Sequence, residues 1–292
     1  MVITLSVPAP DHGGGLAAAA RQVWDDFSGL IRNPLGDEHT VATDTTTDSI
    51  TGIAMARPVH ARSPFGLPDR AVILLSERLL RTASHDERRL SLLHECIHLD
   101  FAFGAHRDRW MRRLRRASDA QSSARQMPLD TEVERQRYED IDRRQTLAFQ
   151  IFSLPDEIFA EQRLKQDYAE WFERRAAYYV SMRQSHEADV VAGRPDDVLW
   201  PFQVFSELIR IEFFRRLVVD LPVSARELDR LAALTAQSLR TCASADLFVF
   251  LNELRPQLLD VTLDTPIATF EAVYERLFER VNETEAVDEC PS

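Results

Sequence analysis

Hydrophobic and polar positions follow two different periods along this chain. Near the N-terminus, short apolar runs predict strands at 2–7 (VITLSV), 51–59 (TGIAMARPV) and 71–76 (AVILLS). The region 38–75 is rich in Thr, Val and Ile and is punctuated by Pro and Gly, so we expect two or three antiparallel strands there. The stretch 15–33 has the period of an amphipathic helix. This part of the chain therefore combines a small sheet with helix.

From residue 77 onward, nearly all of the chain has helical period. Stretches rich in Pro, Gly, Ser or Asp mark candidate breaks between helices, at 117–129, Leu154-Pro155, 192–201, 220–224 and near Pro266. The C-terminal half is predicted to be mostly α-helical, and the fold class to be α+β.

Length, composition and charge narrow the class of protein. The chain has 292 residues, enough for a substantial core, and its hydrophobic share of 45% is that of a globular protein. No apolar run is long enough to cross a membrane, and the N-terminus lacks the features of a signal peptide. The three cysteines are widely spaced, which indicates reduced thiols. We therefore expect a cytoplasmic protein without membrane contact. The net charge of −12 argues against general binding of nucleic acid.

One segment carries candidate chemistry: LSLLHECIHLD at 90–100. His94 and His98 are four residues apart, so on a helix they lie on one face about 5.4 Å apart and can bind one Zn²⁺. Glu95 is offset round the helix, where it can reach a water on the ion as a general base. The alternative is a pair of core histidines that hydrogen-bond within the protein.

The surroundings of this segment predict a buried helix. Ser84 and Glu87 form a capping box, in which each side chain bonds the backbone N–H of the other residue. An apolar stripe follows at Leu90, Leu93, Ile97 and Phe101. The two histidines border that stripe and so face inward, where an imidazole needs a partner. The strand at 71–76 leads into this helix, as an edge strand beside a protease cleft does. We interpret Cys96 as a core residue.

With its strand, its helix and its HECIH sequence, the chain resembles the zincin superfamily of zinc metallopeptidases. The resemblance implies a zincin-like core at 1–190, made of a small antiparallel or mixed sheet and an active-site helix, and leaves 191–292 as a helical C-terminal region. It also implies one Zn²⁺ per chain with a third protein ligand. The metzincin pattern does not continue here, because Phe101 and Gly104 stand where that family has Gly and His.

Glu157 is the first candidate for the third ligand. Ser153 and Pro155 predict a helix start, and the face of Glu157 continues along mostly apolar positions, at Ala160, Glu161, Leu164, Tyr168 and Trp171. Two carboxylates on an inward face need a partner or a metal. The segment from Asp156 to Glu161 also resembles the ligand helix of gluzincins, although Asp156 replaces their usual Asn. The resemblance implies that Glu157 binds zinc and that Glu161 orients a ligand histidine.

His106 is the second candidate. Trp110 follows it by four residues, which resembles SprT-type proteases, although Arg107 stands where that family usually has Gly. The arginines of Arg107–Arg116 form a local basic patch that could contact DNA, and the alternative is a solvated helix face. The SprT-like alternative is a protease that acts on DNA-associated proteins.

The predicted function is hydrolysis of peptide bonds in a peptide or protein by zinc-activated water, with Glu95 as the general base. Candidate donors to the oxyanion are Tyr178, Tyr179 and His186, although the tyrosines could equally be packing residues. The alternative from another class is a non-catalytic zinc-binding interaction module that uses the amphipathic helices of 202–219 and 225–240. The sequence leaves the substrate, the choice between endo- and exopeptidase, and the oligomeric state open.

Overall fold

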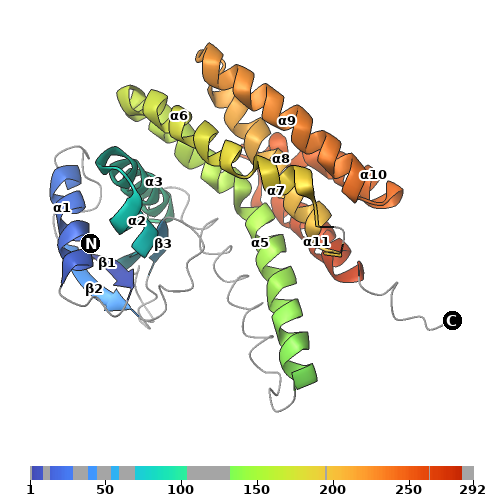
Figure 1. Ribbon diagram of the computed structural model, residues 1–292, viewed down its shortest axis with the longest axis horizontal. Coiled ribbons are helices and arrows are strands. Elements are labelled where there is room, and N and C mark those ends of the chain that lie inside the picture. Colours follow the sequence, from blue (N-terminus) through green and yellow to red (C-terminus); the bar gives the residue numbers. More distant parts are fainter. Residues whose placement is uncertain are drawn as a thin grey trace. The chain divides into compact units, whose positions relative to one another are not determined.

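The structure, a computed structural model, describes residues 2–8, 14–28, 39–44, 54–58, 70–103, 132–194, 196–262 and 264–284. Its contacts divide the chain into two compact units, whose helices and strands are drawn in Figure 1. Unit 1 comprises Met1–Trp110 with Arg163–Arg175, and unit 2 comprises Met111–Gln162 with Ala176–Ser292. Helices dominate, and the sheet is small, so the α+β class is confirmed. The predicted boundary after residue 190 stays a prediction.

A four-stranded mixed sheet forms the core of unit 1. Its strands are β1 (Val2–Pro8), β2 (His39–Asp44), β3 (Ala54–Pro58) and β4 (Arg70–Leu75), and their order is β2-β1-β4-β3. β1 is parallel to both β2 and β4, and β3 is antiparallel to β4. The predicted strands at 2–7, 51–59 and 71–76 are thereby confirmed.

One expectation about this sheet holds in part, and another was wrong. We expected two or three antiparallel strands in 38–75: β3 and β4 are antiparallel to each other, whereas β2 is parallel to β1, because the chain passes through helix α1 (Gly15–Ser28) between β1 and β2. β4 is not an edge strand, since it lies between β1 and β3. Ile73 and Leu75 of β4 are fully buried, as suits an interior strand.

Helices cover this sheet. α1 contacts β1 and β2, while α3 (His85–Phe103) contacts β3, and the two helices also contact each other. They therefore lie side by side on the same face of the sheet. The short helix α2 (Glu77–Thr82) connects β4 to α3 and packs against both α1 and α3. Helix α3 therefore packs against the sheet and against α1 and α2.

Helix α5 (Glu132–Asp167) is continuous, which overturns the predicted break at Leu154-Pro155 and the predicted helix start at Ser153 and Pro155. Pro155 lies inside the helix and is buried, as is Leu154 beside it. A proline in a helix interior removes one backbone hydrogen bond. Burial of the neighbouring apolar side chains offsets that loss, so tertiary packing overrides the local signal.

Unit 2 is built from helices. Besides α5 up to Gln162, it contains the C-terminal part of α6 (Ala169–Ser185), α7 (Glu187–Ala192), α8 (Trp200–Leu217), α9 (Pro222–Cys242), α10 (Ala245–Leu259) and α11 (Ile267–Glu283). The predicted breaks at 192–201, at 220–224 and near Pro266 are confirmed. α8 is the central helix, since it packs against α9 and α10 and Phe202, Phe205 and Phe214 are fully buried.

Arginines connect the helices of unit 2. Arg183 pairs with Glu207, Arg230 with Glu187, and Arg255 with Glu212, so that α6, α9 and α10 are each joined to another helix. The Arg183–Glu207 pair is the most buried of the three. Among the described residues, no helix is both long enough and apolar enough to span a membrane.

Candidate metal centre

The helix that carries HECIH begins as the sequence predicts. Ser84 Oγ accepts a hydrogen bond from the Glu87 N–H at 3.2 Å, and the Glu87 carboxylate accepts one from the Ser84 N–H. This is the predicted capping box. Asp86 and Glu87 also lie at the positive end of the helix dipole, which their charges stabilise. Residues at the start of α3 therefore determine where this helix begins.

α3 is more deeply buried than an amphipathic pattern predicts. Every residue from Leu90 to Leu99 is buried, on all faces of the helix. Leu90, Leu93 and Ile97 of the predicted stripe are among them, whereas the side chain of Phe101 lies outside the described residues. The polar residues of the segment, His94, Glu95 and His98, are at most 8% exposed.

The two histidine rings face each other on α3. His94 Nε2 and His98 Nε2 are 3.0 Å apart, and the ring planes are nearly perpendicular. Within hydrogen-bond distance, one ring nitrogen donates and the other accepts, according to the tautomer. Two nitrogens at 2.0–2.1 Å from one tetrahedral Zn²⁺ would be about 3.3 Å apart. The observed pair is close to that spacing, so the rings fit a shared ion with only a small shift.

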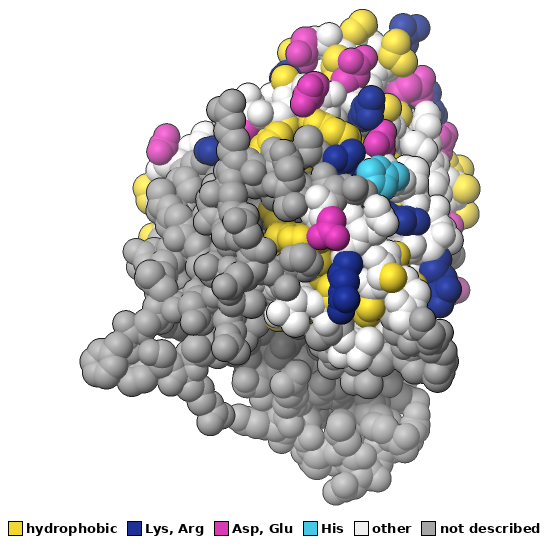
Figure 2. Space-filling view, turned by 90° about the vertical axis from the view of Figure 1, so that its left-hand side faces the viewer, with side chains coloured by type: hydrophobic (Ala, Val, Ile, Leu, Met, Phe, Trp, Pro, Cys, Tyr) yellow, Lys and Arg dark blue, Asp and Glu magenta, His cyan; other side chains and the backbone are white. Residues whose placement is uncertain are grey.

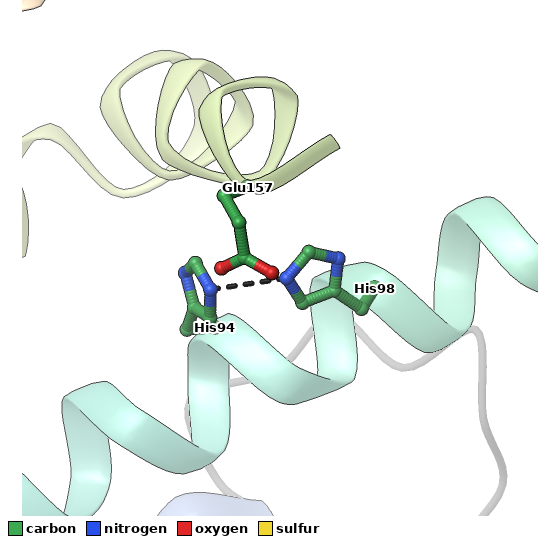
Figure 3. A group of neighbouring side chains, drawn as sticks. All are labelled: His94, His98 and Glu157. Carbon is green, nitrogen blue, oxygen red and sulfur yellow. Dashed lines mark hydrogen bonds between the residues drawn. The ribbon is translucent and has the colours of Figure 1, made fainter. Parts of the chain in front are cut away.

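Glu157 completes the group. One ligand atom each from His94, His98 and Glu157 lies within 4.8 Å of the other two. In the described part of the chain, these three are the His, Cys, Asp or Glu residues that lie close enough together, three or more at once, to hold one metal ion. Figure 3 shows the Glu157 carboxylate directed from its own helix toward the two rings. Glu157 is half-buried, and both histidines are buried. The structure thus brings together the two histidines and the first of the two candidate third ligands.

The residues of α5 that lie close to Glu157 are buried. Ala160 and Glu161 of the predicted inward face are buried, and so is Asp156 beside Glu157. That face ends sooner than predicted, because α5 stops at Asp167 and Tyr168 separates it from α6. Glu161 is one helical turn after Glu157, and its side chain is 2% exposed.

Cys96 lies inside the segment but in a setting that keeps it a thiol. Burial raises the pKa of the Cys96 thiol well above its usual range, and the neighbouring Glu95 carboxylate raises it further. A thiol must lose its proton to bind zinc strongly. Its burial at 3% exposure agrees with a core residue.

The three candidate oxyanion donors are placed differently from one another. Tyr179 is buried, stacks on Phe214 with ring centroids 3.8 Å apart, and donates its hydroxyl proton to the Arg210 backbone oxygen at 3.0 Å. Tyr178 is half-buried, and His186 is exposed in the turn between α6 and α7. Their roles as donors stay predictions, but the hydroxyl of Tyr179 already has a partner.

Tyr179→Phe is expected to lower the free energy of unfolding by about 1 kcal/mol, because it removes one buried hydrogen bond and leaves the ring stacking intact. Burial raises the pKa of Tyr179 to about 12, so the lost group is a neutral hydroxyl at neutral pH. Urea denaturation measures the stability, and the turnover number should stay near that of the parent. A fall in turnover of about a hundredfold or more would instead assign the hydroxyl to the oxyanion.

Arg210 on α8 is a residue near this group that the sequence did not predict. The pKa of Arg210 is lowered chiefly by burial and also by the neighbouring Arg183, while the negative charge of Glu157 opposes this shift. Arg210 is thus near enough to act on the Glu157 carboxylate. Its signal in the sequence is a group of three charged residues, Glu207, Arg210 and Glu212, inside a largely apolar stretch of α8.

The SprT-like alternative depends on residues that the structure does not describe. His106 and Arg107–Arg116 lie outside the described residues, so the proposed ligand and the basic patch stay predictions. On the face drawn in Figure 2, the coloured basic and acidic side chains lie among one another and do not separate by sign. The described part of that face therefore adds nothing to a basic surface.

Comparisons of the chain with known proteins give no further guide to the site. No protein-family model, no curated protein and no solved structure matches this chain.

Proposed function

We propose that this protein is a zinc-dependent metallopeptidase, with one Zn²⁺ held by His94, His98 and Glu157. The observation that carries the proposal is the convergence of two imidazoles and one carboxylate, with their ligand atoms within 4.8 Å of one another. Two histidines and a glutamate are a ligand set of catalytic zinc sites, which leave a fourth position for water or substrate. The mixed sheet with a buried helix on it is compatible with a zincin-like core.

Zinc bound there would polarise the scissile carbonyl and lower the pKa of a water molecule to about 7. Glu95 follows His94 by one residue, so it is turned by about 100° round α3 and does not share the ligand face. We assign it the role of general base, which accepts the proton of the attacking water and passes it to the leaving amine. Its burial, at 8% exposure, keeps bulk water away from that proton.

The residues behind the ligands would hold them in place. Glu161, one turn after Glu157, is proposed to accept a hydrogen bond from an imidazole N–H and so to fix the tautomer of a ligand histidine. Arg210 would stabilise the charged form of the Glu157 carboxylate, since each group favours the charge of the other. Both assignments follow from the arrangement of charges around Glu157.

Zinc analysis of the native protein tests the proposal. The protein, purified without chelator or supplied with zinc and then dialysed, should contain one zinc ion per chain. It should cleave casein or a peptide library, and 1,10-phenanthroline should stop the cleavage until zinc is added back. A protein that binds no zinc would contradict the proposal. Zinc without cleavage of any member of the library would favour the interaction module.

A further inference from the structure

A cavity of about 730 Å³ lies within unit 2, apart from the residues of the metal centre. Its walls come from the end of α7 and the segment that leads to α8, from one face of α9, and from the start of α10. This volume falls in the range of sites for small organic ligands. Two valines of its wall, Val191 and Val198, are 63% and 40% exposed, so the cavity is reached from solvent.

An indole N–H in the wall has no acceptor. Trp200 is 5% exposed, and among the residues that the structure describes, its Nε1 has no hydrogen-bond partner. A buried donor without a partner is unfavourable, and such groups often mark the place of a ligand or a water. The neighbouring wall residue Gly193 leaves room beside it, because a Cβ added there would lie 3.9 Å from Trp200 Nε1.

Gly193 also fixes the path of this wall. Its φ of 69° is in the region that side chains rarely adopt, so glycine allows the chain to turn here at the end of α7. The turn carries Arg194, whose guanidinium lies 5.0 Å from the centre of the Trp200 ring. A cation is thereby held beside the unpaired indole N–H.

Charged side chains, and not the helix ends, decide which ligand the cavity favours. The first turns of α8 and α10 and the last turns of α7 and α9 all contribute to the wall, so helix ends of both signs border the space. Asp197 is the one acidic residue among the described residues of the wall, and its carboxylate pairs with Arg143 and accepts the Leu199 N–H. Among the residues that the structure describes, no carboxylate pairs with Arg194, so its charge is available for a ligand.

The rest of the wall favours an apolar body. Aliphatic surface of the wall comes from Val191, Val198, Pro201, Leu234 and Leu247. Hydroxyl groups of the wall already donate within the protein: Ser238 to the Val190 oxygen and Thr241 to the Gln237 oxygen. Burial raises the pKa of Cys242, so this wall residue adds a neutral thiol.

From the cavity, the unpaired Trp200 N–H and Arg194, we propose that unit 2 binds a small aliphatic carboxylic acid. One carboxylate oxygen accepts the Trp200 indole N–H, the guanidinium of Arg194 pairs with the carboxylate, and the hydrocarbon chain lies against the valines and leucines. The proposal does not depend on the metal centre, and its test measures binding alone.

Indole N–H resonances of the full-length protein test this site with octanoate as the probe. The chain has four tryptophans, and octanoate should shift one indole signal downfield, which is the signal that disappears in Trp200→Phe. By calorimetry, Trp200→Phe should weaken octanoate binding about tenfold or more, since it removes a hydrogen bond to a charged group. Arg194→Gln should weaken it about three- to fivefold and reduce its salt dependence.

Two controls make the outcome decisive. Trp171→Phe removes an indole of unit 1 that also has arginines near its ring, Arg89 at 5.2 Å and Arg174 at 5.3 Å from the ring centre, and should bind octanoate like the parent. 1-Octanol, which has the apolar chain without the charge, should bind more weakly than octanoate. The proposal is overturned if octanoate shifts no indole signal, if it shifts a signal that survives in Trp200→Phe, or if octanol binds as tightly. Arg194 is exposed, so Arg194→Gln keeps the test valid if Trp200→Phe fails to fold.

Discussion

Glu95→Gln is expected to lower the turnover of peptide substrate by about a hundredfold to ten-thousandfold, while the zinc content stays at one ion per chain. The amide keeps the shape of the carboxylate but cannot accept the proton of the attacking water, and general base catalysis contributes about that factor. Glu95 is turned by about 100° from the ligand face of α3, so its replacement leaves the metal ligands unchanged. Turnover number and zinc content are measured on the same preparation.

Glu87→Gln is the matched control on the same helix. It makes the same chemical change eight residues earlier, and glutamine also serves in a capping box, so both turnover and stability should stay near those of the parent. If Glu95→Gln retains turnover, the assignment of the base is wrong. If it loses zinc as well, Glu95 acts on the metal site itself and not on the proton.

Glu157→Ala is expected to abolish retention of zinc. It removes one of three protein ligands and leaves two imidazoles, which bind zinc far more weakly than three ligands do. Zinc per chain after dialysis is the measurement, and turnover should fall with it. Glu173→Ala, at an exposed position of α6, is the matched control and should keep its zinc.

His106→Ala separates the two candidate third ligands. If Glu157 is the ligand, the His106 variant keeps its zinc and its turnover. Loss of zinc in His106→Ala with full zinc in Glu157→Ala would assign the site to the SprT-like alternative. The basic residues of Arg107–Arg116 would then be the first place to look for contact with DNA.

Much of the fold could be predicted because its signals are local. The apolar runs of β1 and β4, the capping box of α3 and the breaks on both sides of α8 all depend on residues close together in the sequence. The parallel pairing of β2 with β1 was missed, since a strand does not carry in its own residues the identity or direction of its partner. Continuity of α5 through Pro155 was missed because packing decided it.

The candidate site divides in the same way. His94, Glu95 and His98 could be identified from spacing alone, because four residues make one helical turn. Glu157 follows 59 positions after His98, and no period connects the two segments, so its assignment needed the gluzincin resemblance. Arg210 and the cavity beside Trp200 were missed, since each is assembled from separate helices. The segment around Gly193 was identified only as a break between helices.

Pro155 has a consequence for how α5 behaves. Proline has no N–H to donate, so the carbonyl oxygen of Ile151 loses its partner four residues later, and the ring crowds that carbonyl. A helix bends most easily where this ladder is interrupted. The interruption lies two residues before Glu157, so the helix can bend next to this carboxylate. A small bend at Pro155 would redirect the Glu157 carboxylate while α5 stayed helical before and after the bend.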